Sequence, residues 1–147
     1  MEITTRMEFD SGHRIPNHKS VCKNLHGHRY AIEVTVKGEV EEQSHESDFG
    51  MVMDFKDAKN LIKKVIVDEW DHAFIAYEKD LEVIAFLNSL DNHKTVILNR
   101  VPTAENMAVT ALELLSSAFR KEFGECIRPT KVRLYETPNN WADALSN

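Results

Sequence analysis

Residues 22–36 read Cys-Lys-Asn-Leu-His-Gly-His-Arg-Tyr-Ala-Ile-Glu-Val-Thr-Val, and their pattern indicates a strand with two histidines at its start. From His26 onward, apolar and polar side chains alternate, as in a β-strand with one buried face. Side chains two residues apart lie on the same face of a strand, about 6.6 Å apart along it. His26 and His28 therefore share the face that carries Tyr30 and the apolar residues after it. The pattern predicts a strand from His26 to about Val40.

A second strand is predicted just upstream, over residues 3–13, where apolar positions again alternate with polar ones. If the two strands pair antiparallel across their short connection, His13 meets the end that carries His26 and His28. Three imidazoles could then hold one metal ion, and three protein ligands leave a fourth position open, as in catalytic zinc sites. The spacing leaves two alternatives open: a closed structural site with Cys22 as fourth ligand, and no metal at all.

Composition restricts the classes of function. The chain has 147 residues, of which 42% are hydrophobic and 29% charged, so we expect one globular domain spanning residues 1–147. A net charge of −6 argues against a nucleic-acid partner. The sequence shows neither a membrane-length apolar stretch nor a signal-peptide pattern, so we expect no membrane partner and a cytoplasmic location. Cys22 and Cys126 do not form a disulfide framework, and Cys126 is expected to have no chemical role.

Charge is distributed unevenly along this acidic chain. Between Ser11 and Ile32 there is no acidic residue. The same segment carries four basic residues, Arg14, Lys19, Lys23 and Arg29. This local excess of positive charge favours a small anionic substrate, although a solvated loop with a chance run of positive charge is an equally good interpretation of the segment alone.

Two amphipathic helices are predicted downstream. Asp54 is a suitable N-cap, and apolar residues recur after it at helical spacing as far as Ile66. Pro102-Thr103 opens the second helix, and Gly124 suits its C-terminal end. A short helix is also possible within residues 81–90.

Three short segments, besides the two long strands, have the composition of strands. They are Gly50–Met53, Thr95–Leu98 and Lys131–Tyr135. The expected fold class is α+β, with an antiparallel four-stranded sheet and two helices packed on one face.

Further polar residues stand where these elements begin or end. Asp71-His72 follows the first helix, Thr103-Ala-Glu105-Asn106 opens the second, and Glu136 ends the last strand. Together with His13, the Cys22-x-x-x-His-Gly-His motif and residues 50–55, these motifs resemble the 6-pyruvoyl tetrahydropterin synthase family over nearly the whole chain. Within that family the sequence is most similar to the bacterial 6-carboxy-5,6,7,8-tetrahydropterin synthases of the queuosine pathway. Each motif alone is weak evidence for the family, but the presence of all of them in the same order is strong evidence.

The resemblance implies a role for each matched position. The implied zinc ligands are His13, His26 and His28. The implied catalytic groups are Cys22 as the thiol, with Asp71 and His72 as its charge-relay partners. The implied substrate-binding residues are Glu136, which would anchor the pterin ring, and Thr103 and Glu105, which would line its pocket. A carboxylate can accept two parallel hydrogen bonds from the adjacent N–H and amino groups of a pterin, so Glu136 suits this task.

The resemblance also implies the tunnelling fold and a homohexamer of two stacked trimers, in which Asp71-His72 would serve the thiol of a neighbouring chain. The implied reaction is the zinc-dependent conversion of 7,8-dihydroneopterin triphosphate to 6-carboxy-5,6,7,8-tetrahydropterin, with release of triphosphate and acetaldehyde. The three-residue spacing between Cys22 and His26 favours this carboxy synthase. The alternatives are a pyruvoyl synthase, which forms a diketone, and a non-catalytic zinc-binding module. Residues 38–49 and 76–102 look longer than in shorter family members.

Overall fold

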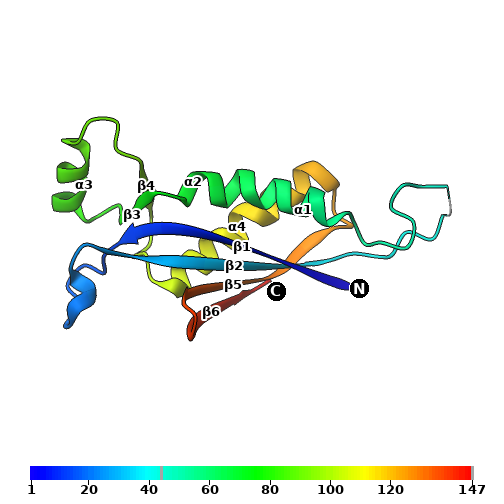
Figure 1. Ribbon diagram of the computed structural model, residues 1–147, viewed down its shortest axis with the longest axis horizontal. Coiled ribbons are helices and arrows are strands. Elements are labelled where there is room, and N and C mark those ends of the chain that lie inside the picture. The colour runs from blue at the N-terminus through cyan, green and yellow to red at the C-terminus, as the bar shows by residue number, and fades with distance from the viewer. Residues whose placement is uncertain (44, 147) are drawn as a thin grey trace.

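The computed structural model describes residues 1–43 and 45–146. A mixed sheet forms one layer and most of the helical residues form the other (Figure 1). The strands are β1 (Glu2–His13), β2 (His26–Lys37), β3 (Ala73–Tyr77), β4 (Thr95–Leu98), β5 (Arg128–Thr137) and β6 (Asn140–Leu145). The helical segments are the 3-10 turn η1 (Val21–Lys23), α1 (Phe55–Ile62), the π-helical turn η2 (Lys63–Val67), α2 (Asp68–Trp70), α3 (Leu81–Asn88) and α4 (Ala104–Phe123).

The pairing of β1 with β2 forms the centre of the sheet. The two strands are antiparallel, with His13 opposite His26 and Ser11 opposite His28, so the expected meeting of their histidine ends is confirmed. The order across the sheet is β4-β3-β1-β2-β5-β6. Strands β2, β5 and β6 are antiparallel to their neighbours, whereas β3 runs parallel to both β1 and β4.

The expectation of a four-stranded antiparallel sheet was therefore wrong, because the described residues form six strands in a mixed sheet. Strand β3 was missed because its short apolar run, Ala73–Tyr77, has no alternation that separates a strand from a buried helix. It runs parallel to β1 because the helical segments from α1 to α2 lead from the end of β2 back toward the histidine ends, and β3 continues in that direction beside Ser11–His13 (Figure 1). Strand β6 was also missed. It pairs with β5 in a hairpin at the edge of the sheet.

Two smaller expectations also need correction. Residues Gly50–Met53 form a turn rather than a strand, with the Met51 amide donating to the Asp48 carbonyl. Strand β2 ends at Lys37 instead of Val40, and Gly38 makes the last backbone hydrogen bonds of the pairing, with Met1. The single-domain organisation over residues 1–147 stays a prediction, and Ser44 and Asn147 lie outside the described residues.

The core lies between the sheet and the two long helical segments. The inward residues Ile32 and Val34 of β2 are completely buried, and they belong to one cluster with the apolar stripes of α1 and α4. Both helices begin where expected, because the Asp54 side chain accepts from the Lys56 amide and Thr103 accepts from Asn106. The N-terminus of α4 lies near the histidine end of β1, because the Pro102 carbonyl just before the helix is 2.7 Å from His13 Nδ1. No helix among the residues described is long and apolar enough to cross a membrane.

Candidate functional site

Three imidazoles converge where β1 ends and β2 begins. His13 comes from β1, and His26 and His28 come from β2. The Nε2 atoms of His13 and His26 lie 3.1 Å apart, and one ring nitrogen from each histidine lies within 4.8 Å of the others. Cys22 is not a member of this group, which among the described residues consists of the three histidines alone. The arrangement is a cluster of three potential metal ligands with the thiol outside it.

Backbone carbonyls orient two of the three rings. His13 Nδ1 lies 2.7 Å from the Pro102 carbonyl, and His26 Nδ1 lies 2.8 Å from the Asn24 carbonyl. Because a carbonyl only accepts, each Nδ1 carries the proton and donates it, which leaves the Nε2 lone pair facing the cluster. Such carbonyl contacts are the usual outer support of a metal-binding histidine.

Burial favours the neutral form of two of the three imidazoles, those of His13 and His28. The His13 side chain is 1% exposed, and desolvation lowers its pKa below the usual range, against the opposing effect of its hydrogen bond to the Pro102 carbonyl. Desolvation also lowers the pKa of His28. Neutral imidazole is the form that binds metal, so the site requires little deprotonation at pH 7.

Gly27 allows the two strands to approach closely between the histidines. A Cβ at this position would lie 2.8 Å from the carbonyl oxygen of Ser11, which is backbone and cannot move aside without disrupting the pairing. A glycine between His26 and His28 therefore lets β2 keep register with β1 at the point where their imidazoles meet.

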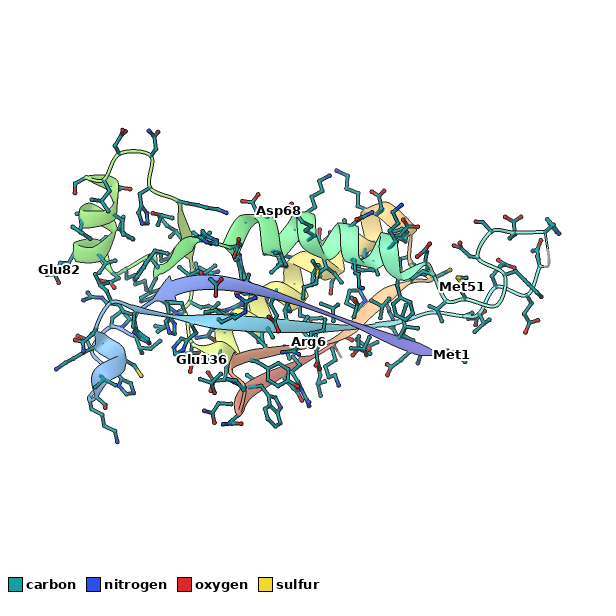
Figure 2. All side chains as sticks on the ribbon, viewed as in Figure 1. Met1, Arg6, Met51, Asp68, Glu82 and Glu136 are labelled. Atoms are coloured by element: carbon teal, nitrogen blue, oxygen red, sulfur yellow. The ribbon has the colours of Figure 1, made fainter. Side chains whose placement is uncertain are left out.

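Glu136 brings a carboxylate to the same place from β5. Its Oε1 atom lies 3.6 Å from the Nε2 of His13 and 3.8 Å from the Nε2 of His28. The side chain is 31% exposed, so it faces both the imidazoles and the solvent-accessible pocket beside them. Figure 2 shows Glu136 on the part of the sheet that lies away from Met1.

A cavity of about 250 Å³ adjoins the cluster. Four residues expected in the site, Cys22, Thr103, Glu105 and Glu136, line it together. Cys22 is a free, half-buried thiol. His18 and Trp141 also line the cavity and were not expected there. His18 belongs to the histidine-rich segment and could have been included on that ground, whereas Trp141 stands on β6, a strand that sequence reasoning missed.

Asp71 and His72 lie elsewhere. His72 lines a different, open depression, which it shares with His26 and His28, and it is absent from the cavity that contains Cys22. The pair is nonetheless well ordered: His72 Nδ1 lies 2.8 Å from Asp71 Oδ2, and the Asp10 amide donates to Asp71 Oδ1 at 2.9 Å. These two hydrogen bonds, the Asp10 bond first, lower the pKa of Asp71. The imidazole is thus oriented and 78% exposed.

Two of the four basic residues expected near an anion are already paired. Arg14 makes a bidentate contact with Asp80, at 2.7 and 2.6 Å. Arg29 contacts Glu8 at 3.0 Å and Asp10 at 3.3 Å. Lys19 and Lys23 are exposed on the loop that carries Cys22. Of the basic set, these two lysines are the better candidates for contacting phosphate.

Comparison with known proteins is consistent with this site. The family model described as 6-pyruvoyl tetrahydropterin synthase matches residues 2–146. A 6-carboxy-5,6,7,8-tetrahydropterin synthase from Rickettsia bellii is 37% identical over 140 residues, covering 95% of this chain and 96% of the relative. The enzyme of the same name from Haemophilus influenzae is 32% identical over 145 residues, covering 97% and 96%.

Solved structures share the fold. A crystal structure of an uncharacterised protein from Wolinella succinogenes superposes with a TM-score of 0.80 at 22% identity, covering 100% of this chain and 98% of that one. The 6-pyruvoyl tetrahydropterin synthase of Caenorhabditis elegans superposes with a TM-score of 0.68 at 26% identity, covering 100% and 96%. The mixed sheet with helices on one face is thus a known architecture.

Proposed function

The chain belongs to the 6-pyruvoyl tetrahydropterin synthase family, and we propose that it converts 7,8-dihydroneopterin triphosphate to 6-carboxy-5,6,7,8-tetrahydropterin with release of triphosphate and acetaldehyde. Relatives that carry the corresponding name cover nearly the full length of the chain. The observation that carries the proposal is the shared cavity: Cys22 and Glu136 line one pocket, and Glu136 also touches the cluster of three imidazoles.

His13, His26 and His28 are the proposed ligands of a zinc ion. Their number, their closeness and the neutral state favoured by burial fit a site with three protein ligands. Such an ion, when bound, supplies a Lewis acid that polarises the oxygens of the substrate side chain. Imidazole also accommodates other divalent metals, so the preference for zinc follows from the family and from the ligand set.

Glu136, Thr103 and Glu105 are the proposed pterin-binding residues. The pterin edge presents two adjacent donors, and the half-exposed Glu136 carboxylate, which already lines the cavity, can accept both. Thr103 is the N-cap of α4, so its position is set by the helix start. Lys19 and Lys23 are the proposed partners of the triphosphate because each is exposed and directly follows a residue that lines this cavity, His18 or Cys22.

Cys22 is the proposed proton-transferring thiol, and Asp71 and His72 are its proposed partners. Because His72 lines a different depression from the one that Cys22 lines, we propose that the pair acts on the thiol of a neighbouring chain in a homohexamer. Asp71 would hold the tautomer and orientation of His72, so that the exposed nitrogen of the ring can exchange a proton with substrate. We place the reaction in queuosine biosynthesis in the cytoplasm.

The decisive experiment is to incubate the zinc-loaded protein with 7,8-dihydroneopterin triphosphate and to measure acetaldehyde together with the pterin product. Equal amounts of acetaldehyde and 6-carboxytetrahydropterin are expected. A diketone product without acetaldehyde would identify a pyruvoyl synthase instead. Intact substrate in the presence of bound zinc would leave the non-catalytic zinc-binding module as the better interpretation.

A further inference from the structure

Two buried hydroxyl groups have no hydrogen-bond partner among the described residues: Thr5 Oγ1 and the phenol oxygen of Tyr30. Tyr30 is completely buried. A buried hydroxyl without a partner has lost its hydrogen bonds to water and gained none, so it lowers the stability of the fold. A phenol in this state at a functional site therefore calls for an explanation.

The Tyr30 ring packs directly against the imidazole cluster. Its centroid lies 5.9 Å from that of His13 and 5.6 Å from that of His28, both in edge-to-face geometry. Phe9 stacks on it at 5.3 Å with an interplanar angle of 14°. The ring is thus held between neighbours on both strands, and the hydroxyl is carried by a side chain with little freedom to move.

Glu136 is the acceptor that lies near this ring. Its carboxylate contacts the imidazoles of His13 and His28, the same two rings against which Tyr30 packs. A tyrosine phenol is protonated at pH 7, so the Tyr30 hydroxyl is a hydrogen-bond donor. Ala31 of β2 pairs with Tyr135 of β5, so Glu136 stands beside Tyr30 on the neighbouring strand, yet the Tyr30 hydroxyl makes no hydrogen bond to it or to another described residue.

We propose that Tyr30 is a positioning residue whose hydroxyl donates a hydrogen bond to the Glu136 carboxylate when a pterin occupies the cavity. The inference rests on the proposed function of Glu136 as pterin anchor. A carboxylate offers about four acceptor positions and the pterin edge uses two, which leaves one for the phenol. Ligand binding then recovers a hydrogen bond that folding leaves unmade, and the carboxylate is held in the orientation that accepts both pterin donors.

The test variant is Tyr30→Phe, which removes the hydroxyl and leaves the ring packing intact. Two effects of opposite sign are expected. The thermal unfolding midpoint of the metal-free protein stays equal or rises, because an unpartnered polar atom is removed. The dissociation constant for neopterin, measured by quenching of pterin fluorescence on the zinc-loaded protein, rises roughly tenfold, as for a lost hydrogen bond to a charged group. Zinc content should not change.

Thr5→Val is the matched control because it removes the other unpartnered hydroxyl. Thr5 pairs with Val34, far along β1 from the histidines. It should show the same equal or higher midpoint and an unchanged affinity for neopterin. A weakened affinity in this variant would mean that loss of a buried hydroxyl acts through general loosening of the sheet, which would overturn the assignment to Tyr30.

A double-mutant cycle with Glu136→Gln identifies the acceptor. If the phenol acts through the carboxylate, the losses of neopterin affinity in the two single variants should not add in the double variant. Additive losses would assign the acceptor elsewhere and refute the proposal, as would a lower midpoint in Tyr30→Phe, since the hydroxyl would then already have a partner. Failure of wild-type protein to bind neopterin would instead contradict the proposed function, and the unfolding midpoints would still report on the hydroxyl.

Discussion

The imidazoles of His13, His26 and His28 and the thiol of Cys22 play different parts at the residue scale. The imidazoles lie within 4.8 Å of one another, two of them oriented by backbone carbonyls, whereas the thiol lines the adjoining cavity. This separation of ligand and reactive group is what an open metal site requires. A closed structural site, by contrast, would need the Cys22 thiol as its fourth ligand, so the two kinds of site predict different zinc contents when Cys22 is replaced.

Replacing Cys22 and replacing His26 should therefore have different consequences. Cys22→Ala should retain zinc and lower turnover by roughly 10²- to 10⁴-fold, the usual contribution of a proton-transferring group. His26→Ala should lose zinc and turnover together because two ligands remain. Zinc content by atomic emission and acetaldehyde release, measured on the same samples, check both. Release of zinc from Cys22→Ala would indicate the closed structural site.

Glu136 has a separable role at the same scale. Glu136→Ala should keep zinc, because the carboxylate is not in the ligand group, and should weaken neopterin binding by roughly 10- to 100-fold as the charged acceptor is lost. Glu113→Ala, which removes a carboxylate paired with Arg100 on the surface of α4, is the control and should bind neopterin normally. Unchanged affinity in Glu136→Ala would rule out the anchor role.

At the scale of elements, one ion pair attaches the loop after β1 to the start of α3. Asp80 is buried, and its two carboxylate oxygens accept hydrogen bonds from Nε and Nη2 of Arg14. Arg14 directly follows the proposed ligand His13. The contact spans 66 residues of sequence, and it explains why Arg14 is a poor candidate for holding phosphate.

Acid should weaken this attachment in a defined pH range. The hydrogen bond from Arg14 lowers the pKa of Asp80 below its value in the unfolded chain. The ion pair therefore contributes its full stability above about pH 4, near the unfolded pKa, and loses it as the pH falls through the lower folded pKa. Asp80→Asn should cost about 2 kcal/mol of unfolding free energy at pH 7, less than a fully buried pair because Arg14 is partly exposed.

Urea unfolding of wild type and Asp80→Asn at a series of pH values checks this. The difference in unfolding free energy between the two proteins should shrink as the pH falls below about 4. At that pH the Asp80 carboxyl group of the unfolded wild-type chain begins to be protonated, whereas the folded protein holds it ionised to a lower pH. A difference that stays constant down to pH 2.5 would show that the amide disrupts packing and that the charge of Asp80 is unimportant.

At the scale of the whole molecule, one chain does not bring all the expected catalytic residues together. His72 borders one depression and Cys22 lines another. The Asp71-His72 pair is oriented by its hydrogen bonds to each other and to Asp10, yet the ring is exposed to solvent. An oriented, exposed imidazole outside the cavity that Cys22 lines fits the proposal that it completes a site in a second copy.

Mixing inactive variants tests this arrangement. Cys22→Ala and His72→Ala should each be inactive alone. After the two are unfolded and refolded together at equal ratio, up to about a quarter of the sites formed between different chains would contain both intact residues. Recovery of activity toward that level, in a fraction of hexamer size on gel filtration, supports the shared site. No recovery despite mixed assembly would place both residues in a site within one chain.

The elements that follow from local pattern could be predicted from the sequence. The alternation along β1 and β2 correctly predicted which residues face the core and that the ends carrying His13 and His26 meet. The caps of α1 and α4 at Asp54 and Thr103 are also local, since each bonds an amide two or three residues ahead. These features depend on backbone periodicity and short-range hydrogen bonds, which the order of residues specifies directly.

Only the tertiary structure decided the features that depend on distant contacts. The short apolar run of β3 becomes a strand because β1, which lies about 60 residues away in sequence, provides its pairing partner. The contacts of Glu136 with His13 and of Arg14 with Asp80 likewise join residues far apart in the chain. Periodicity carries no information about such pairs, because each depends on how whole elements pack. For this reason the cluster of histidines could be expected from sequence, whereas the surroundings that tune it could not.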